Sequence, residues 1–109
     1  MKDRTKAQDQ VVMALVWYRP EQWQRVRDIA TDSEVFEDSY TEWLQQAEEK
    51  FAKLQRTGVR VEKVNVDSEK LILWCNEHGL ENNGAARTAY AAERLSELDK
   101  RRSLIQDRT

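Results

Sequence analysis

The chain has few of the residues that build covalent, metal-bound or phosphate-binding sites. Its 109 residues include one cysteine, one histidine, one proline and three glycines. A single cysteine excludes a disulfide within the chain and leaves too few sulfur and imidazole ligands for a structural zinc site unless a dimer supplies two more. The glycines, Gly58, Gly79 and Gly84, stand apart, so no glycine-rich phosphate-binding loop is possible. We therefore expect no metal, no cofactor, and a protein of the reducing cytoplasm.

Long hydrophobic segments and an excess of one charge are also missing. The apolar run from Val11 to Trp17 is far shorter than the ~20 residues of a membrane-spanning helix. Asp3, Asp9 and Pro20 flank it, which is not the pattern of a secretory signal. The 18 basic and 20 acidic residues leave a net charge of -2, which creates no overall attraction to nucleic acid or to an anionic membrane. We expect a soluble protein that does not bind membranes.

The residues that are present predict one folded domain. The chain is 39% hydrophobic and 35% charged, and its four Trp, three Tyr and two Phe supply core anchors that disordered segments lack. We expect residues 1–10 to be a flexible polar tail and residues 11–98 to be a single globular domain. Residues 99–109 should form a charged C-terminal tail that frays.

Two segments have the pattern of β-strands. Val11 to Trp17 is apolar on both faces, which is typical of a strand covered by helices. Val59 to Val66 alternates valine with polar residues, but the alternation slips at Glu62-Lys63. Either a β-bulge or burial of both faces would explain this slip.

Each strand is followed by two segments with the pattern of helices. Pro20 suits the first turn of a helix that should end at residues 31–33. Apolar residues then repeat three and four apart from Phe36 to Leu54, which predicts the main core helix. Ser39 or Thr41 would cap a later start of this helix.

The second half of the chain repeats the plan of strand, helix and helix. Asp67 suits the N-cap of a helix that Gly79 ends. A turn then leads into a last helix from Ala85 to Leu98. We therefore predict a helix-rich α/β or α+β fold of order β-α-α-β-α-α with a small two-stranded sheet.

The orientation of the two strands stays open at this point. Parallel and antiparallel pairing differ only in how the first helical pair returns the chain, and the sequence does not decide between them. A two-stranded sheet has two exposed edges and is marginal on its own. Pairing of strands between two chains would extend it, so a homodimer is the first partner that we expect.

Several strings of residues occur in an order that is typical of one family. They are Trp17-Tyr18-Arg19-Pro20-Glu21-Gln22-Trp23, Glu42-Trp43-Leu44, Val61-Glu62-Lys63-Val64, Trp74-Cys75 and Gly84-Ala85-Ala86-Arg87. Over roughly residues 13 to 95 the chain resembles a family of short uncharacterised bacterial proteins. The resemblance implies a free-standing bacterial cytoplasmic protein, and it carries no activity or site residue with it.

The ends of the two strands carry the best candidates for a ligand site. Ligands of open α/β sheets lie beyond the carboxyl ends of the strands, where this chain has Tyr18, Arg19 and Asp67. Parallel pairing would bring these three together, and Arg87 could join them. Arginine with tyrosine suits an anionic group. In the alternative, Asp67 caps a helix, Arg19 is solvated and Tyr18 packs at an edge.

Cys75 and His78 form a second candidate site, since a thiolate and an imidazole can act as nucleophile and base. Their spacing of three places them on one helical face. That face also carries Leu71 and Trp74, and a thiol in apolar surroundings has a raised pKa and little reactivity. A structural thiol is therefore the favoured interpretation.

A basic C-terminal segment is the third candidate. It contains Lys100-Arg101-Arg102, with Arg94 before it and Arg108 after it, and it could contact phosphate. Nearby acidic residues dilute this charge, and the chain has no nucleic-acid-reading motif. Nucleic acid is therefore the least favoured partner.

These observations favour an interaction or regulatory module that acts through protein contacts rather than an enzyme. The alternative is a small-molecule or anion-binding protein, or an enzyme, with its site at the strand ends. Nucleic-acid binding through the C-terminus is third. No residue is singled out as catalytic.

Overall fold

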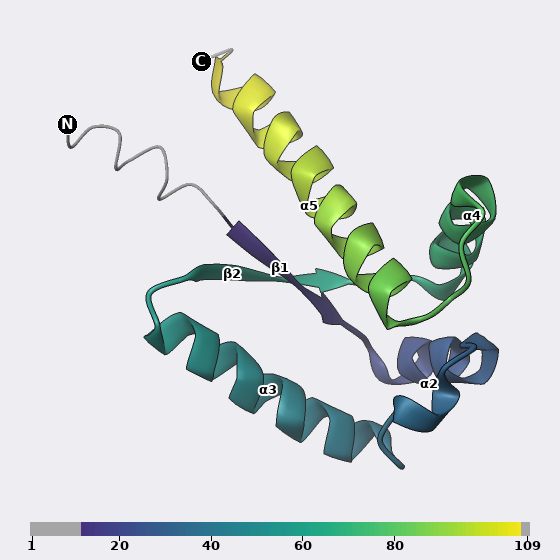
Figure 1. Ribbon diagram of the computed structural model, residues 1–109. Coiled ribbons are helices and arrows are strands. Elements are labelled where there is room, and N and C mark those ends of the chain that lie inside the picture. Colours follow the sequence, from purple (N-terminus) through teal and green to yellow (C-terminus); the bar gives the residue numbers. More distant parts are fainter. Residues whose placement is uncertain (1–11, 108–109) are drawn as a thin grey trace.

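The fold follows the predicted order of elements. A computed structural model describes residues 12–107, with side chains to residue 102, so the tail predicted at residues 1–10 lies outside the described residues. The elements are β1 (Val12–Trp17), α2 (Pro20–Ile29), the 3₁₀ turn η1 (Ser33–Val35), α3 (Tyr40–Arg56), β2 (Arg60–Asn65), α4 (Ser68–His78) and α5 (Gly84–Asp107). Figure 1 shows them along the chain, and the helix-rich α+β prediction is confirmed.

The two strands pair in parallel. Val12 lies opposite Arg60 and Trp17 opposite Asn65, with one partner for each residue between them. This pairing settles the orientation that the sequence left open. Because the register is unbroken, a bulge at Glu62-Lys63 does not explain the slip in the alternation.

Burial of both faces of β2 explains the slip instead. Lys63 lies on the α3 face, where its Nζ is 4.6 Å from the centre of the Phe51 ring of α3. Val64 lies on the opposite face and packs with Ala91 and Leu95 of α5. A strand with a helix on each face can have valines at both odd and even positions, because side chains on both faces are covered.

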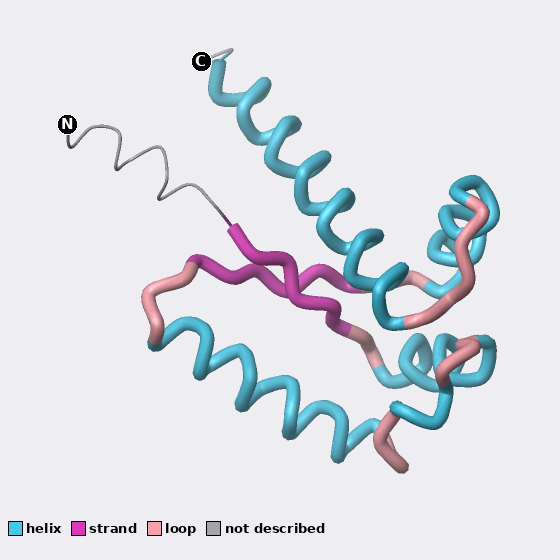
Figure 2. The backbone as a smooth tube through the Cα atoms, viewed as in Figure 1, coloured by secondary structure: helices cyan, strands magenta, loops and turns pink. Residues whose placement is uncertain are grey.

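The sheet lies between α3 and α5. Figures 1 and 2 show α5 passing over one face and α3 running along the other. On the α5 face the contacts are aliphatic and close: Val12, Ala14 and Val16 pack against a cluster that contains the fully buried Ala91. Small side chains at this crossing allow the helix to approach the sheet.

A larger core closes the carboxyl end of the sheet. Its buried members come from the strand ends and from α2, α4 and α5: Tyr18, Trp23, Val26, Val66, Leu71, Cys75, Ala86 and Tyr90. Partly buried aromatic residues of α3 and of the loop before it pack against this cluster. This core fixes the residues at the strand ends, where the sequence placed its candidate site.

Local capping sets the helix boundaries close to those predicted. The main core helix starts at Tyr40, later than Phe36, because the Ser39 hydroxyl accepts a hydrogen bond of 3.2 Å from the Glu42 N–H. Asp67 caps α4 by accepting from two backbone N–H groups. Gly79 ends α4 in the left-handed conformation at φ 65°.

The last helix ends later than the sequence suggested. We predicted an end at Leu98, whereas α5 continues to Asp107. No glycine or proline follows Leu98 to stop the helix. Arg102 also bonds to Asp99 one turn earlier, at 3.1 Å, and to Glu62 of β2, at 3.3 Å, which ties this part of the helix to the sheet.

Candidate functional site

A groove of about 1270 Å³ runs along β1 between α3 and α5. Met13 and Leu15 line it from one face of the strand, and Ala14 and Val16 line it from the other. Alternate side chains of a strand point to opposite faces, so a cavity that touches both sets must pass around the unpaired edge of the strand. β1 has β2 on one side only, so the groove follows its free edge.

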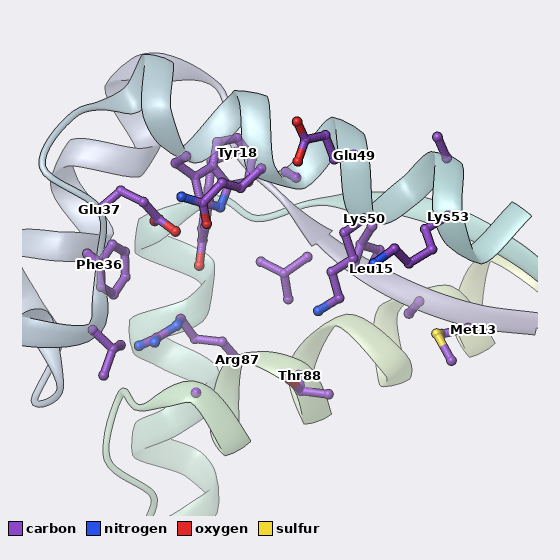
Figure 3. A pocket seen from close by; sticks show the side chains of 18 of the residues that line it. Met13, Leu15, Tyr18, Phe36, Glu37, Glu49, Lys50, Lys53, Arg87 and Thr88 are labelled. Carbon is purple, nitrogen blue, oxygen red and sulfur yellow. The ribbon is translucent and has the colours of Figure 1, made fainter.

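The groove has apolar surfaces inside and cations along one wall. Phe36, Trp43, Ala47 and the 43% exposed Met13 supply apolar surface. Lys50, Lys53 and Arg56 line the α3 wall, roughly one turn apart. In Figure 3 the Lys50 and Lys53 side chains lie close to Leu15, with Arg87 and Thr88 of α5 across the groove.

The three cations of the α3 wall are exposed and have no carboxylate partner among the residues that the structure describes. Two carboxylates, Glu37 and Glu49, also line the groove. Glu37 lies near Phe36 at the far end, and Glu49 projects from α3 away from Leu15 in Figure 3. The stretch beside Met13 and Leu15 is therefore positively charged.

Arg87 and Asp32 form a buried ion pair at the other end of the groove. Arg87 Nη1 and Nη2 donate to the two carboxylate oxygens of Asp32, both at 3.0 Å. Nη1 also donates to the Asn82 side chain at 2.9 Å, and the guanidinium lies 4.8 Å from the centre of the Phe36 ring. The Arg87 side chain is only 7% exposed, so this bidentate pair holds the loop around Asp32 against the start of α5.

The ion pair also sets the protonation of its neighbours. The hydrogen bond from Arg87, more than any other contact, holds the pKa of Asp32 below its usual value, so the carboxylate stays ionised. Tyr18 is buried beside the pair, and burial raises its pKa to about 12, although the Arg87 charge acts in the opposite direction. Tyr18 is therefore a neutral phenol at physiological pH.

The structure brings together two of the four residues predicted as a ligand site. Tyr18 and Arg87 both line the groove. Arg19 lies outside it, with an exposed side chain 3.7 Å from Glu21. Asp67 also lies outside the groove, and its carboxylate caps α4. Parallel pairing brings the strand ends together, but the side chains beyond them point to different surroundings.

Cys75 and His78 also have different surroundings. Cys75 is buried in the core at the strand ends, and this burial raises the pKa of its thiol. His78 is exposed, stacks on the Trp74 ring with centroids 4.2 Å apart, and has Nδ1 2.8 Å from the Trp74 carbonyl oxygen. The thiol is accordingly protonated and shielded, which matches the structural role that the sequence favoured.

Carboxylates pair with some of the arginines of the basic C-terminal segment. Arg94 pairs with Glu97 at 3.0 Å, and Arg102 bonds to both Asp99 and Glu62. Arg108 lies outside the described residues. These carboxylates weaken the field that the segment presents to phosphate.

Sequence reasoning missed the groove and its cationic wall. The sequence pattern indicated that Lys50 and Lys53 belong to a solvated helix face. Their spacing of three was the only signal that they share one side of the helix. Asp32 gave no signal, because its partner Arg87 is 55 positions away. The sequence pattern predicted Met13 to be one apolar residue of a buried strand.

Two further features of the fold concern membranes and metals. No helix within residues 12–107 has both the length and the hydrophobicity of a membrane-spanning segment. In the same part of the chain, no three His, Cys, Asp or Glu side chains are grouped as metal ligands would be.

Comparison with curated proteins and with solved structures finds no match. A family model described as a domain of unknown function, DUF8829, matches residues 1–100. The match covers most of the chain, and the predicted membership of an uncharacterised family is confirmed at this level. The protein belongs to the DUF8829 family of domains of unknown function.

Proposed function

We propose that the protein is a protein-interaction module, and that its docking element is the free edge of β1. The observation that carries this proposal is the groove that passes around the edge and touches both faces of the strand. An edge strand presents unpaired backbone N–H and C=O groups, which form a template for another strand. Strand addition to such an edge is a common way to bind an extended segment.

The ladder indicates which backbone groups are free. The Val66 N–H donates to the Trp17 carbonyl at 2.9 Å, so the Trp17 backbone faces β2. Backbone groups alternate in direction along a strand, so Met13 and Leu15 also face β2, and Ala14 and Val16 face outward. An added strand would therefore bond to Ala14 and Val16 without disturbing the β1–β2 ladder.

The homodimer expected from the sequence is the second candidate for this edge, with a second copy of the chain supplying the added strand. Two β1 strands joined edge to edge would give a four-stranded sheet, which is more stable than a pair. We also propose a cytoplasmic location, since the only cysteine is a buried thiol. A regulatory role would follow if the bound partner is itself regulated.

Protein contact is favoured over small-anion binding because Arg87 is already engaged. Its guanidinium makes a bidentate pair with Asp32 and bonds to Asn82, so an anion at this end would have to displace a carboxylate. The neutral Tyr18 adds no charge. The proposed role of Tyr18, Arg19, Asp67 and Arg87 as a ligand site therefore stays the second candidate.

The proposal is tested by removing one outward N–H from β1. Ala14→Pro deletes this donor on the open edge, where proline is tolerated, and Ala14→Ser is a control that keeps it. The tagged wild type and both variants serve as baits in a lysate of the source organism, and their melting temperatures are compared. We expect a partner, or a second copy, to be retained by the wild type and Ala14→Ser and lost by Ala14→Pro. Equal retention by a folded Ala14→Pro would contradict the proposal.

A further inference from the structure

We infer that the groove accepts an extended segment of another protein in which acidic residues alternate with apolar ones. The inference rests on the proposed use of β1 as a docking edge and adds the chemistry of the partner. It depends on the shape of the groove, on the uncompensated charge of the α3 wall, and on the two different faces that an added strand would meet.

The shape of the groove suits a single strand. Its walls are α3, with Trp43 and Ala47, and the start of α5, with Gly84 and Thr88. Neighbouring strands lie ~4.8 Å apart, and a helix covers a sheet at about 10 Å, so a bare third strand fits in the plane of the sheet between two such helices. A second copy would bring its own α3 and α5 to the same edge. An extended segment brings no helices and needs no such rearrangement.

The charge of the groove gives no preference for β1 of a second copy. Lys50, Lys53 and Arg56 have no carboxylate partner among the described residues, whereas Arg87 is neutralised by Asp32. The segment Val12–Trp17 of a second copy contains no charged residue. Residues 1–10 contain three basic and two acidic residues, so they repeat the sign of the wall. Carboxylates from another protein would complement it.

The two faces of an added strand predict the alternation. Side chains on one face would point to α3, toward Lys50, Lys53 and Arg56. Side chains on the other face would lie beside Ala14 and Val16, on the side of the sheet that α5 covers. A period of two therefore places acidic residues at every second position and apolar residues between them. Glutamate suits the acidic positions, because its methylene groups can lie on Met13 and Leu15 while its carboxylate reaches the wall.

The test uses three capped peptides long enough to pair with the whole of β1. They alternate valine with glutamate, with threonine or with lysine, and each is titrated to millimolar concentration into the full chain while the Ala14 and Val16 amide resonances are followed. We expect the valine-glutamate peptide to bind at least ~10-fold more tightly than the valine-threonine peptide at low salt, with a smaller ratio at high salt. The valine-lysine peptide should bind most weakly.

Charge-reversal variants assign the preference to the wall. The triple variant Lys50→Glu, Lys53→Glu, Arg56→Glu should invert the ranking, so that the valine-lysine peptide binds best. Lys70→Glu, on the exposed surface of α4 away from the groove, is the control and should leave the ranking unchanged. Ala14→Pro should abolish binding of every peptide.

The remaining outcomes separate this inference from the proposed function. Equal binding of the glutamate and threonine peptides, lost in Ala14→Pro, would overturn the acidic partner and leave strand addition standing. If the wild type has the mass of a dimer in solution and Ala14→Pro has the mass of a monomer, this inference is likewise overturned, because a second copy would occupy the edge. Peptide binding that persists in Ala14→Pro, or no resonance shift with any peptide, would overturn both.

Discussion

The face of the sheet that meets α5 is more closely packed than the face that meets α3, which is open beside β1. On the α5 face, Val64, Ala91 and Leu95 are buried and pack directly on β1. On the α3 face, Met13 is 43% exposed and lines a groove of about 1270 Å³. One face therefore contributes most of the packing of the sheet, and the other leaves strand surface free for a partner.

The size of the side chains explains the difference. Alanines at the α5 crossing allow the helix to lie close to both strands. On the α3 face, Trp17 contacts Trp43 and Phe51 edge to face, with ring centres 5.3 and 6.3 Å apart. These aromatic contacts anchor α3 at the carboxyl end of β1, whereas Met13 near the other end is 43% exposed. Packing is thus closer on the α5 face than on the α3 face.

The largest effect should come from a cavity on the α5 face. Leu95→Ala removes a side chain that is 4% exposed, and we expect a loss of about 3 kcal/mol in the free energy of unfolding. Met13→Ala on the α3 face should cost less than ~1 kcal/mol. Urea unfolding measures both, and equal losses would show that the two faces do not differ in packing.

The second effect concerns the ion pair that shapes one end of the groove. Asp32→Ala leaves the buried Arg87 charge without its partner, and we expect a loss of about 2–3 kcal/mol. The loop around Asp32 should also loosen, which amide exchange at Phe36 and Glu37 would detect. A loss similar to that of an exposed ion pair would mean that Arg87 gains water or another partner in the variant.

The same pair predicts acid sensitivity. Because the folded pKa of Asp32 is lowered by Arg87, the stabilisation is present above the unfolded pKa of ~3.9 and is lost as the pH falls through the folded value. Urea unfolding of the wild type and of Asp32→Asn between neutral pH and pH ~3 measures this. Their difference in stability should shrink toward the acid end, and a constant difference would contradict the assignment.

The third effect appears in alkali. The folded pKa of Tyr18 is raised by burial to about 12, so the unfolded chain releases this proton first. The contribution of Tyr18 to stability is therefore present below pH ~10 and is lost as the pH rises toward the folded pKa. Tyr18→Phe should weaken this loss and remove a late step from the tyrosinate absorbance titration. An unchanged titration would place Tyr18 in a more solvated site.

The smallest effect should come from Lys63, which lies over aromatic rings on the α3 face. Its Nζ is 4.2 Å from the centre of the Trp17 ring and 4.6 Å from that of Phe51. Lys63→Met keeps the aliphatic stem and removes the charge, and we expect a loss of ~0.5–1 kcal/mol. Lys70→Met is the exposed control and should change the stability by less. Equal changes in stability in the two variants would show that the charge of Lys63 does not stabilise this face.

Much of the fold could be predicted from the sequence, but little of the groove could be. Asp67 and Gly79 act within a few residues of themselves, so their patterns located both ends of α4 correctly. Ser39 was one of two caps offered for a later start of the main core helix, and it is the cap that the structure has. The end of α5 was misplaced because its last part is tied by Arg102 to Glu62 on another element. Of the predicted ligand residues, Tyr18 and Arg87 line the groove, whereas Arg19 and Asp67 do not.

The sequence by itself determined the order of the elements, because apolar periodicity, caps and stops are local and each depends on neighbours along the chain. Only the tertiary structure decided the parallel pairing, the closer packing of the α5 face, and the bond between Arg87 and Asp32 across 55 positions. It also placed Lys50, Lys53 and Arg56 beside the free edge of β1. These features depend on how helices pack on the sheet, and packing joins residues whose separation in the sequence carries no periodic signal.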